Sequence, residues 1–239
     1  MKPKVPEPTD PQLKEGWEQL RREATLRAVK CLEETIPQKI VYLNTLVPVT
    51  GEIGSLLHLT DMPVSRIESR EHLNNCGKRV KLDDENVVFT HEVAANEAVL
   101  RKSETSRDEA LHLIEVISSI KLWIQLNVPR IEDGNNFGVA IQEGAIQELQ
   151  RSEETAFSVM ESITKYHMTR AKIASKVIKY PMIHDYRRCL EQLDANEWIN
   201  QKTILVELRN SYASLFDMLR KNWEKVAKPR EKSGFGLIM

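Results

Sequence analysis

Apolar residues recur at intervals of three and four along four stretches of the chain. In the stretch closest to the C-terminus they are Leu205, Leu208, Tyr212, Leu215, Leu219 and Val226. An internal stretch repeats the spacing at Leu113, Ile117, Ile120, Ile124 and Val128. Such spacing puts the apolar side chains on one face of an α-helix. Both stretches are therefore predicted to be amphipathic helices. In the last one, the polar Asn222 occupies a position where the period calls for an apolar residue.

The other two stretches are less regular. The first has apolar positions at Leu13, Trp17, Leu20, Ala24, Ala28 and Cys31. It then meets Pro37, where we expect a kink or a break because proline removes a helical donor. The third has them at Ile146, Leu149, Ala156, Met160, Ile163, Ala174 and Val177, with the polar Glu153, His167 and Arg170 on the same seam.

Few helix-breaking residues interrupt the second half of the chain. From residue 145 to residue 228 there is no glycine, and the one proline is Pro181. This predicts two long helices separated near Tyr180 and Pro181. Helices of thirty residues are rods of roughly 45 Å and need partners along their length. The sequence therefore predicts an all-α fold, an antiparallel four-helix bundle of long helices.

Residues 48–103 break the helical pattern with prolines, glycines and an Asn-Asn-Cys-Gly cluster. We expect a long, irregular and flexible connection between helices one and two, of a length that is often functional or disordered. The predicted organisation is an N-terminal segment with helix one at 1–47, this connection, helices two to four at 104–232, and a C-terminal tail at 233–239.

The charge balance excludes some partners. Lys and Arg total 34 against 35 Asp and Glu, which gives a formal charge of -1. The protein therefore has no overall positive electrostatic field that would attract nucleic acid or an anionic membrane. The three cysteines are far apart and odd in number, which favours a reducing compartment. The sequence predicts a soluble intracellular protein with neither nucleic acid nor membrane as a partner.

Catalytic motifs are scarce. Glu109 and His112 have the spacing of half a di-iron site, but no other histidine follows a glutamate at that distance. There is no glycine-rich phosphate loop, no Gly-x-Ser-x-Gly and no Cys-x-x-Cys. We expect no catalytic residues, no metal and no cofactor.

A short basic run lies within the connection, at Lys78, Arg79 and Lys81. It is either a solvated charge run or a short nuclear import motif, which must be exposed and extended to be recognised. Both interpretations stay open.

The loop between helices two and three is longer than a turn requires. A helix–helix turn needs two to five residues, whereas this loop has nine: Arg130, Ile131, Glu132, Asp133, Gly134, Asn135, Asn136, Phe137 and Gly138. Pro129 ends the preceding helix, and Gly134 and Asn135 tolerate left-handed backbone angles. We place the next helix after Gly138. A loop of this kind at the end of a bundle is predicted to contact a partner.

The run from Val128 to Gln142 resembles the activation loop of the eleven-S class of proteasome activators. Further matches are the runs 36–44, 121–125, 163–166, 169–172, 179–181, 185–188, 207–212, 222–225 and 228–230. The likeness covers most of residues 10–47 and 105–232. Residues 169–188 are most similar to the gamma subunit of the class, which is nuclear and homo-heptameric.

This resemblance implies a heptameric ring that opens the gate of the core proteasome without ATP. The tail residues Leu237, Ile238 and Met239 would insert between outer-ring subunits, with the terminal carboxylate pairing with a lysine. Asp133, Gly134 and Asn135 would displace the gating segments. Family tails commonly end in tyrosine, and this chain ends in methionine. The expected location is the nucleus, and also the cytoplasm.

An alternative function uses the same bundle without the proteasome. In it, the protein is a nuclear scaffold that binds partner proteins through residues 48–103.

Overall fold

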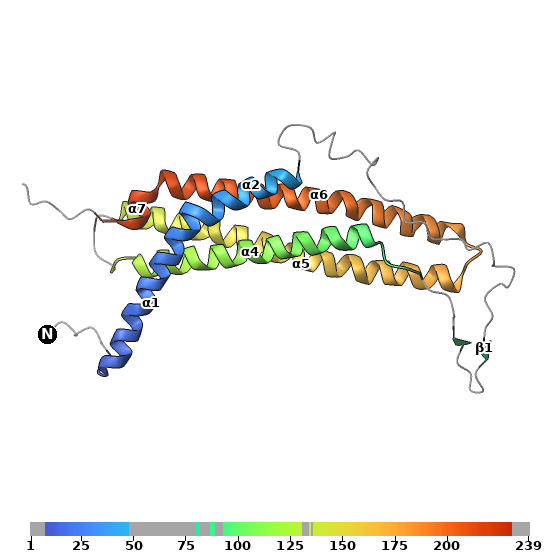
Figure 1. Cartoon of the computed structure of the whole chain (residues 1–239), viewed down its shortest axis with the longest axis horizontal. Coiled ribbons are helices and arrows are strands. Elements are labelled where there is room, and N and C mark those ends of the chain that lie inside the picture. Colours follow the sequence, from blue (N-terminus) through green and yellow to red (C-terminus); the bar gives the residue numbers. More distant parts are fainter. Residues whose placement is uncertain are drawn as a thin grey trace, which may run out of the picture. The chain divides into compact units, whose positions relative to one another are not determined.

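The computed structural model describes residues 8–47, 80–81, 87–88, 93–130, 134 and 136–230, which are mostly helical. The helices are α1 (Pro11–Lys30), η1 (Cys31–Thr35), α2 (Ile36–Leu46), α4 (Glu97–Asn127), α5 (Phe137–Lys179), α6 (His184–Lys221) and α7 (Trp223–Ala227). Two-residue strands, β1 (Val80–Lys81) and β2 (Val87–Val88), pair antiparallel. The predicted helical bundle is confirmed (Figure 1).

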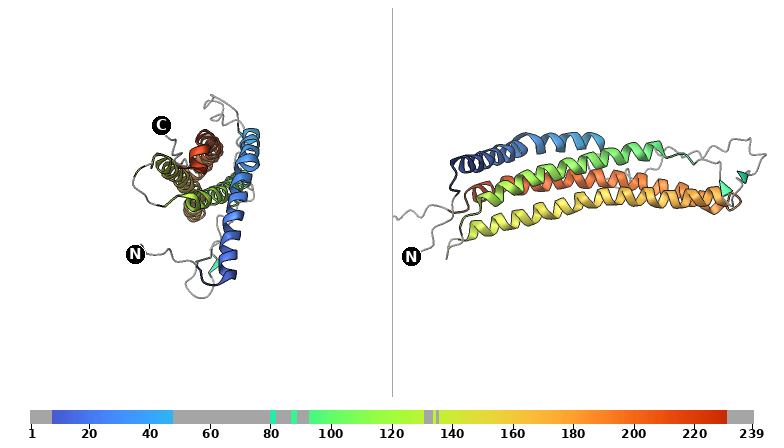
Figure 2. Two further views of the ribbon diagram at one scale, coloured as in Figure 1. Left: turned by 90° about the vertical axis from the view of Figure 1, so that its left-hand side faces the viewer. Right: turned by 90° about the horizontal axis from the view of Figure 1, so that it is seen from below.

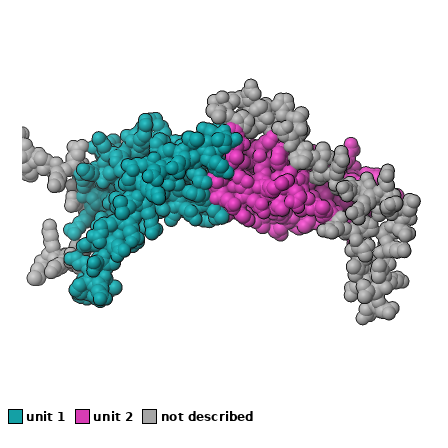
Figure 3. Space-filling model, viewed as in Figure 1, with its two compact units in different colours: residues 1–45, 111–157, 208–239 teal, residues 46–110, 158–207 magenta. Residues whose placement is uncertain are grey.

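The chain divides into two compact units (Figure 3). Unit 1 comprises residues 1–45, 111–157 and 208–239, and unit 2 comprises residues 46–110 and 158–207. The residues of α4, α5 and α6 are shared between the units. The sequence predicts one bundle and gives no sign of this division, since a continuous apolar seam does not reveal where helix contacts group.

Unit 1 is an antiparallel four-helix arrangement. Lys121 of α4 forms an ion pair with Glu153 of α5, whereas Asn127, further along α4, accepts from the earlier Gln142 of α5. The two helices therefore run in opposite directions. Seen end-on from the side of unit 1, α2, α4, α5 and α6 surround a common interior (Figure 2). Its largest fully buried side chains are Ile36, Leu43, Leu113, Ile117, Ile120, Ile124, Leu149, Leu208, Tyr212 and Leu219.

The seam of the last helix is buried as predicted. All six of its apolar positions lie in the interior: Leu205, Leu208, Tyr212, Leu215, Leu219 and Val226. The polar Asn222, which interrupts the apolar period, lies at the break between α6 and α7. The break near Pro181 is also confirmed, since α5 ends at Lys179 and α6 begins at His184.

The first helix departs from its prediction. Its N-terminus is capped by Asp10, whose side chain accepts from the Gln12 amide at 2.9 Å. A π-helical turn, η1, precedes Pro37, which accounts for the expected kink. Ala24 and Ala28 are buried, but the predicted seam residues Leu13, Trp17 and Leu20 are exposed. Figure 1 shows that α1 diverges from the direction of α2.

The connection also ends earlier than predicted. Helix α4 begins at Glu97 rather than near residue 104. Asn96 accepts from the Val99 amide at 3.3 Å, the geometry of an N-cap. This capping asparagine is hard to recognise in the sequence because the surrounding segment lacks a clear apolar period.

Among the described residues, no helix combines the length and apolar character needed to cross a membrane.

Candidate functional site

The end of α4 is held by side chains from two other helices. Helices leave their last carbonyls without partners. Here the Nε2 atom of Gln142 in α5 donates to the Asn127 carbonyl at 3.4 Å, and Arg21 in α1 donates to the Leu126 carbonyl at 3.2 Å. The chain then leaves the bundle through Val128, Pro129 and the exposed Arg130. The point where the predicted loop begins is thus fixed to unit 1.

Part of the predicted loop is described. Gly134 is exposed and has φ +85°, a left-handed conformation that favours glycine. Asn136 immediately precedes α5, and its carbonyl accepts from the Ala140 amide at 3.0 Å. Phe137, which follows it, is 73% exposed. Ile131, Glu132, Asp133 and Asn135 lie outside the described residues.

The predicted end of the loop needs correction. Helix α5 begins at Phe137, so Phe137 and Gly138 belong to its first turn rather than to the loop. Gly138 is buried against the backbone of Pro229: a Cβ atom added at Gly138 would lie 2.0 Å from the Pro229 carbonyl oxygen. Glycine at this position reflects close backbone packing, which a one-dimensional pattern does not distinguish from a helix-starting glycine.

The segment that leads into the C-terminal tail lies against the same turn of α5. Gln142 is fully buried, and its Nε2 atom donates to the Val226 carbonyl at the end of α7 at 2.8 Å. Arg230 Nη2 donates to Asn136 Oδ1 at 3.1 Å. We call residues 136–142 together with 226–230 the shared anchor. It joins the exit of the loop to residues 226–230, which precede the tail in the sequence.

A pair of tryptophans packs beside the shared anchor. Trp123 near the end of α4 stacks on Trp223 at the start of α7, with ring centroids 5.0 Å apart and an interplanar angle of 16°. Offset-stacked aromatic pairs contribute about 0.5–1.5 kcal/mol beyond the area they bury. The stack therefore stabilises α7, and with it the segment leading to the tail, against the bundle.

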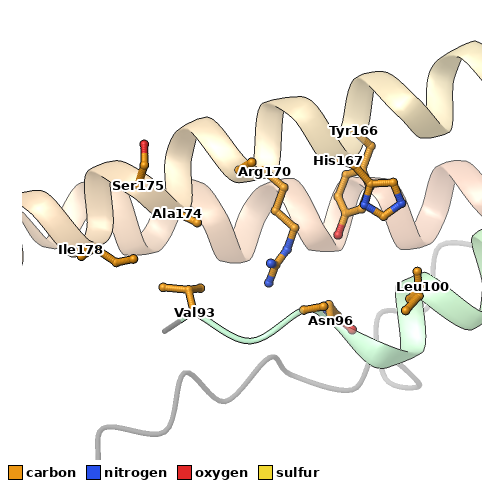
Figure 4. Close-up of a pocket in the computed structure, with 11 residues that line it drawn as sticks. Val93, Asn96, Leu100, Tyr166, His167, Arg170, Ala174, Ser175 and Ile178 are labelled. Carbon is orange, nitrogen blue, oxygen red and sulfur yellow. The ribbon is translucent and has the colours of Figure 1, made fainter. Parts of the chain in front are cut away.

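Unit 2 contains a pocket of about 390 Å³ between the start of α4 and the C-terminal part of α5 (Figure 4). Arg170 points into it from α5, with Tyr166 and His167 one turn earlier. Arg170 and Tyr166 both donate to the buried carboxylate of Asp194. Burial, and then the hydrogen bond to Asp194, raise the pKa of Tyr166, so its hydroxyl stays a donor. These groups satisfy one another, which identifies them as structural.

The half di-iron motif lies on α4, where Glu109 is buried and His112 is half-buried. Within the part of the chain that the structure describes, no group of three His, Cys, Asp or Glu side chains is arranged to hold a metal ion.

Of the remaining predicted site residues, the structure describes only Lys81. The tail residues Leu237, Ile238 and Met239 and the basic residues Lys78 and Arg79 lie outside the described residues, while Lys81 is in β1. Sequence reasoning missed Gln142, Pro229 and Arg230 as site residues. For Gln142 a signal existed: it occupies a core position of α5, in register with the buried Gly138, Ala145 and Leu149.

The family model described as "Proteasome activator PA28, C-terminal" matches residues 92–235, well over half of the chain. The chain belongs to the PA28 proteasome activator family. "Proteasome activator complex subunit 3" of Gallus gallus is 34% identical over 242 residues, covering 94% of this chain and 95% of that protein. The human protein of the same name is 45% identical over 139 residues, covering 58% and 55%.

Solved structures agree with this membership. The 11S subunit of the Plasmodium falciparum proteasome, PA28, matches with a TM-score of 0.85 and 45% identity, covering 96% of this chain and all of that one. A chain from the archaebacterial 20S proteasome–PA26 complex has a TM-score of 0.61 at 14% identity, covering 90% and 92%. At that identity the second match shows the fold alone. Membership of PA28 indicates a regulatory role.

Proposed function

We propose that this chain is a non-catalytic activator of the core proteasome that docks by its C-terminal tail and opens the substrate gate with the loop between α4 and α5. In this mechanism Leu237, Ile238 and Met239 bind between outer-ring subunits and supply affinity. The loop, which ends at Asn136 because α5 begins at Phe137, favours the open state of the gate. A ligand shifts such an equilibrium only through contacts that differ between the two states.

The observation that carries this proposal is the shared anchor. Arg230 precedes the tail and donates to Asn136, the last loop residue before α5. The docking element and the gate-opening element therefore leave unit 1 from adjacent positions. A protein that docks with one segment and acts with another needs both on the same face.

Assembly into a heptameric ring is part of the proposal. The exposed residues Leu13, Trp17 and Leu20 form a stripe on one face of α1, which we call the α1 stripe. Exposed apolar patches commonly mark protein contacts, and a ring places each stripe against a neighbouring copy. Seven tails on one ring bind by avidity, since each later tail docks at high effective concentration.

The mechanism assigns no role to ATP, because the sequence carries no glycine-rich phosphate-binding loop. We also propose that the protein acts in the nucleus as well as the cytoplasm, with Lys78, Arg79 and Lys81 as the import motif. Fluorescence microscopy of a tagged chain with these three residues changed to alanine tests that location separately from the gate mechanism.

Two variants test the gate mechanism. Asn135→Tyr places a bulky ring in the loop, and should abolish stimulation of fluorogenic peptide cleavage while the protein still binds the core proteasome. Removal of Leu237 to Met239 should abolish binding itself. Asn210→Tyr, the same change at an exposed position of α6, serves as the control. Normal stimulation by either of the first two variants contradicts the mechanism.

A further inference from the structure

We infer that the shared anchor sets the position of the loop, and that Gln142 and Gly138 are positioning residues for gate opening. The inference rests on the proposed function and adds to it a mechanical role for residues outside the loop and the tail. Neither residue belongs to the part of the loop expected to touch the proteasome. Each acts through the segments that it holds together.

Gln142 connects three parts of unit 1 through one amide group. Its Nε2 atom donates to the Asn127 carbonyl, where the chain enters the loop, and to the Val226 carbonyl, where it approaches the tail. Gln142 itself lies in α5, just after the loop exit. Its Oε1 atom has no hydrogen-bond partner among the described residues. Both hydrogen bonds of the side chain are therefore donated by Nε2.

Gly138 provides the second connection. The absence of a side chain lets α5 approach the Pro229 backbone so closely that an added Cβ would overlap it, at 2.0 Å from O, 2.6 Å from C and 2.7 Å from Cα. These are backbone atoms, so a rotamer change cannot relieve the overlap. Any side chain at 138 must displace the first turn of α5 or residues 226–230. Asn136, two residues before Gly138, would move with that turn.

The loop and the tail respond differently to such a displacement. Nine residues, from Glu231 to Met239, separate the shared anchor from the terminal carboxylate. An extended chain of that length reaches roughly 30 Å, so a shift of about 1 Å at the anchor still leaves the tail within reach of its pocket. The loop, by contrast, runs directly into the shared anchor at Asn136, with no intervening residues that could absorb the shift. Disturbing the anchor should therefore impair gate opening while sparing docking.

The test compares Gly138→Ala and Gln142→Met with two controls on the same helix. Gly144→Ala adds a Cβ that meets nothing within 4 Å, and Gln147→Met makes the same change at an exposed position. Each purified protein is titrated against core proteasome with a fluorogenic peptide. This yields the concentration for half-maximal stimulation and the stimulation at saturation.

We expect the two anchor variants to lose about tenfold in saturating stimulation, a size typical of coupling between linked sites. The half-maximal concentration should stay within about twofold of wild type, because docking is retained. Particle mass and circular dichroism establish that each variant is folded, and two different substitutions guard against one that misfolds. Hydrogen exchange at residues 136–140 should be faster in both.

Two results overturn the inference. One is saturating stimulation and a half-maximal concentration that both equal those of wild type in folded Gly138→Ala and Gln142→Met. The other is an unchanged saturating level with a raised half-maximal concentration, which would show that the anchor serves the tail alone. Failure of the proposed function is distinguishable from both, because the wild-type protein itself would then give no stimulation.

Discussion

Arg170 of α5 and Asp194 of α6 form a bidentate ion pair in unit 2, with Nε–Oδ1 at 3.0 Å and Nη2–Oδ2 at 3.2 Å. Arg170 also donates to the Ala94 carbonyl at 3.0 Å, and Tyr166 donates its hydroxyl to Asp194 at 2.8 Å. One buried carboxylate thus links α5, α6 and the residues leading into α4. The point where the long connection rejoins the helices is held by this network.

Asp194→Asn should destabilise the protein strongly. It removes the negative charge from Asp194 while leaving Arg170 largely buried. Breaking a buried pair on one side typically costs about 3–5 kcal/mol. Urea unfolding followed by circular dichroism measures the loss. In the control Asp217→Asn, which breaks the exposed pair with Lys221, the change should stay within about 1 kcal/mol. Equal small losses in both variants would contradict the assigned role of Asp194.

Glu197 should make stability depend on pH. Its pKa is raised, chiefly by burial, against the opposing effects of hydrogen bonds from Gln201 and Asn200 and of His167. The folded protein therefore holds this proton more tightly than the unfolded chain. The contribution to stability is present below the ordinary value of 4.5 and is lost as pH rises through the raised pKa.

Glu197→Gln removes this titration. The variant should gain free energy of unfolding relative to wild type as pH rises from 4.5 toward neutrality. Denaturant unfolding at several pH values measures the difference, and the exposed Glu148→Gln serves as control. A wild-type–variant difference that does not change over this range would count against the burial effect.

Gly134→Ala should affect activation more than stability. At φ +85° an alanine is strained by about 1–2 kcal/mol, so the loop should leave its conformation. Because Gly134 is exposed and a Cβ there meets nothing within 4 Å, the global free energy of unfolding should change by less than about 1 kcal/mol. Saturating stimulation of peptide cleavage should fall, whereas Gly144→Ala should retain it. Full stimulation by Gly134→Ala would show that this backbone conformation is dispensable.

The α1 stripe should be required for assembly. The double variant Trp17→Ser with Leu20→Ser removes two large apolar side chains, each contributing about 1.5–3 kcal/mol when buried. Analytical ultracentrifugation should show association weakened about a hundredfold or more, with helix content retained. Leu26 is 70% exposed on the opposite side of α1, so Leu26→Ser is the matched control. An unchanged particle mass in the double variant would place the contact between copies elsewhere.

Local signals predicted much of the fold. The spacing from Leu205 to Val226 identified a buried seam. The polar Asn222 in that seam coincides with the end of α6, which the spacing alone does not predict. Pro181 marked the break between the two longest helices. These features depend on helix geometry and on backbone donors, both of which act over a few residues. The start of α4 at Glu97 was missed because the capping residue Asn96 acts without an apolar pattern around it.

The site was harder to predict for a different reason. The run from Val128 to Gln142 identified the loop through its length and its resemblance to eleven-S activators. It gave no role to Pro229 or Arg230, because the contacts of Gly138 with Pro229 and of Asn136 with Arg230 join residues more than ninety positions apart. Periodicity carries no information on such distant neighbours.

By itself, then, the sequence determined the long helices, the break at Pro181, and the family to which the loop belongs. Only the tertiary structure decided that Leu13, Trp17 and Leu20 are exposed. It also decided that Gln142 bonds both to Asn127, just before the loop, and to Val226, in the segment before the tail. The physical reason is that an apolar period states which face of a helix avoids water. Whether another helix is present to cover that face, and which distant carbonyls a buried amide meets, depends on how the whole chain packs.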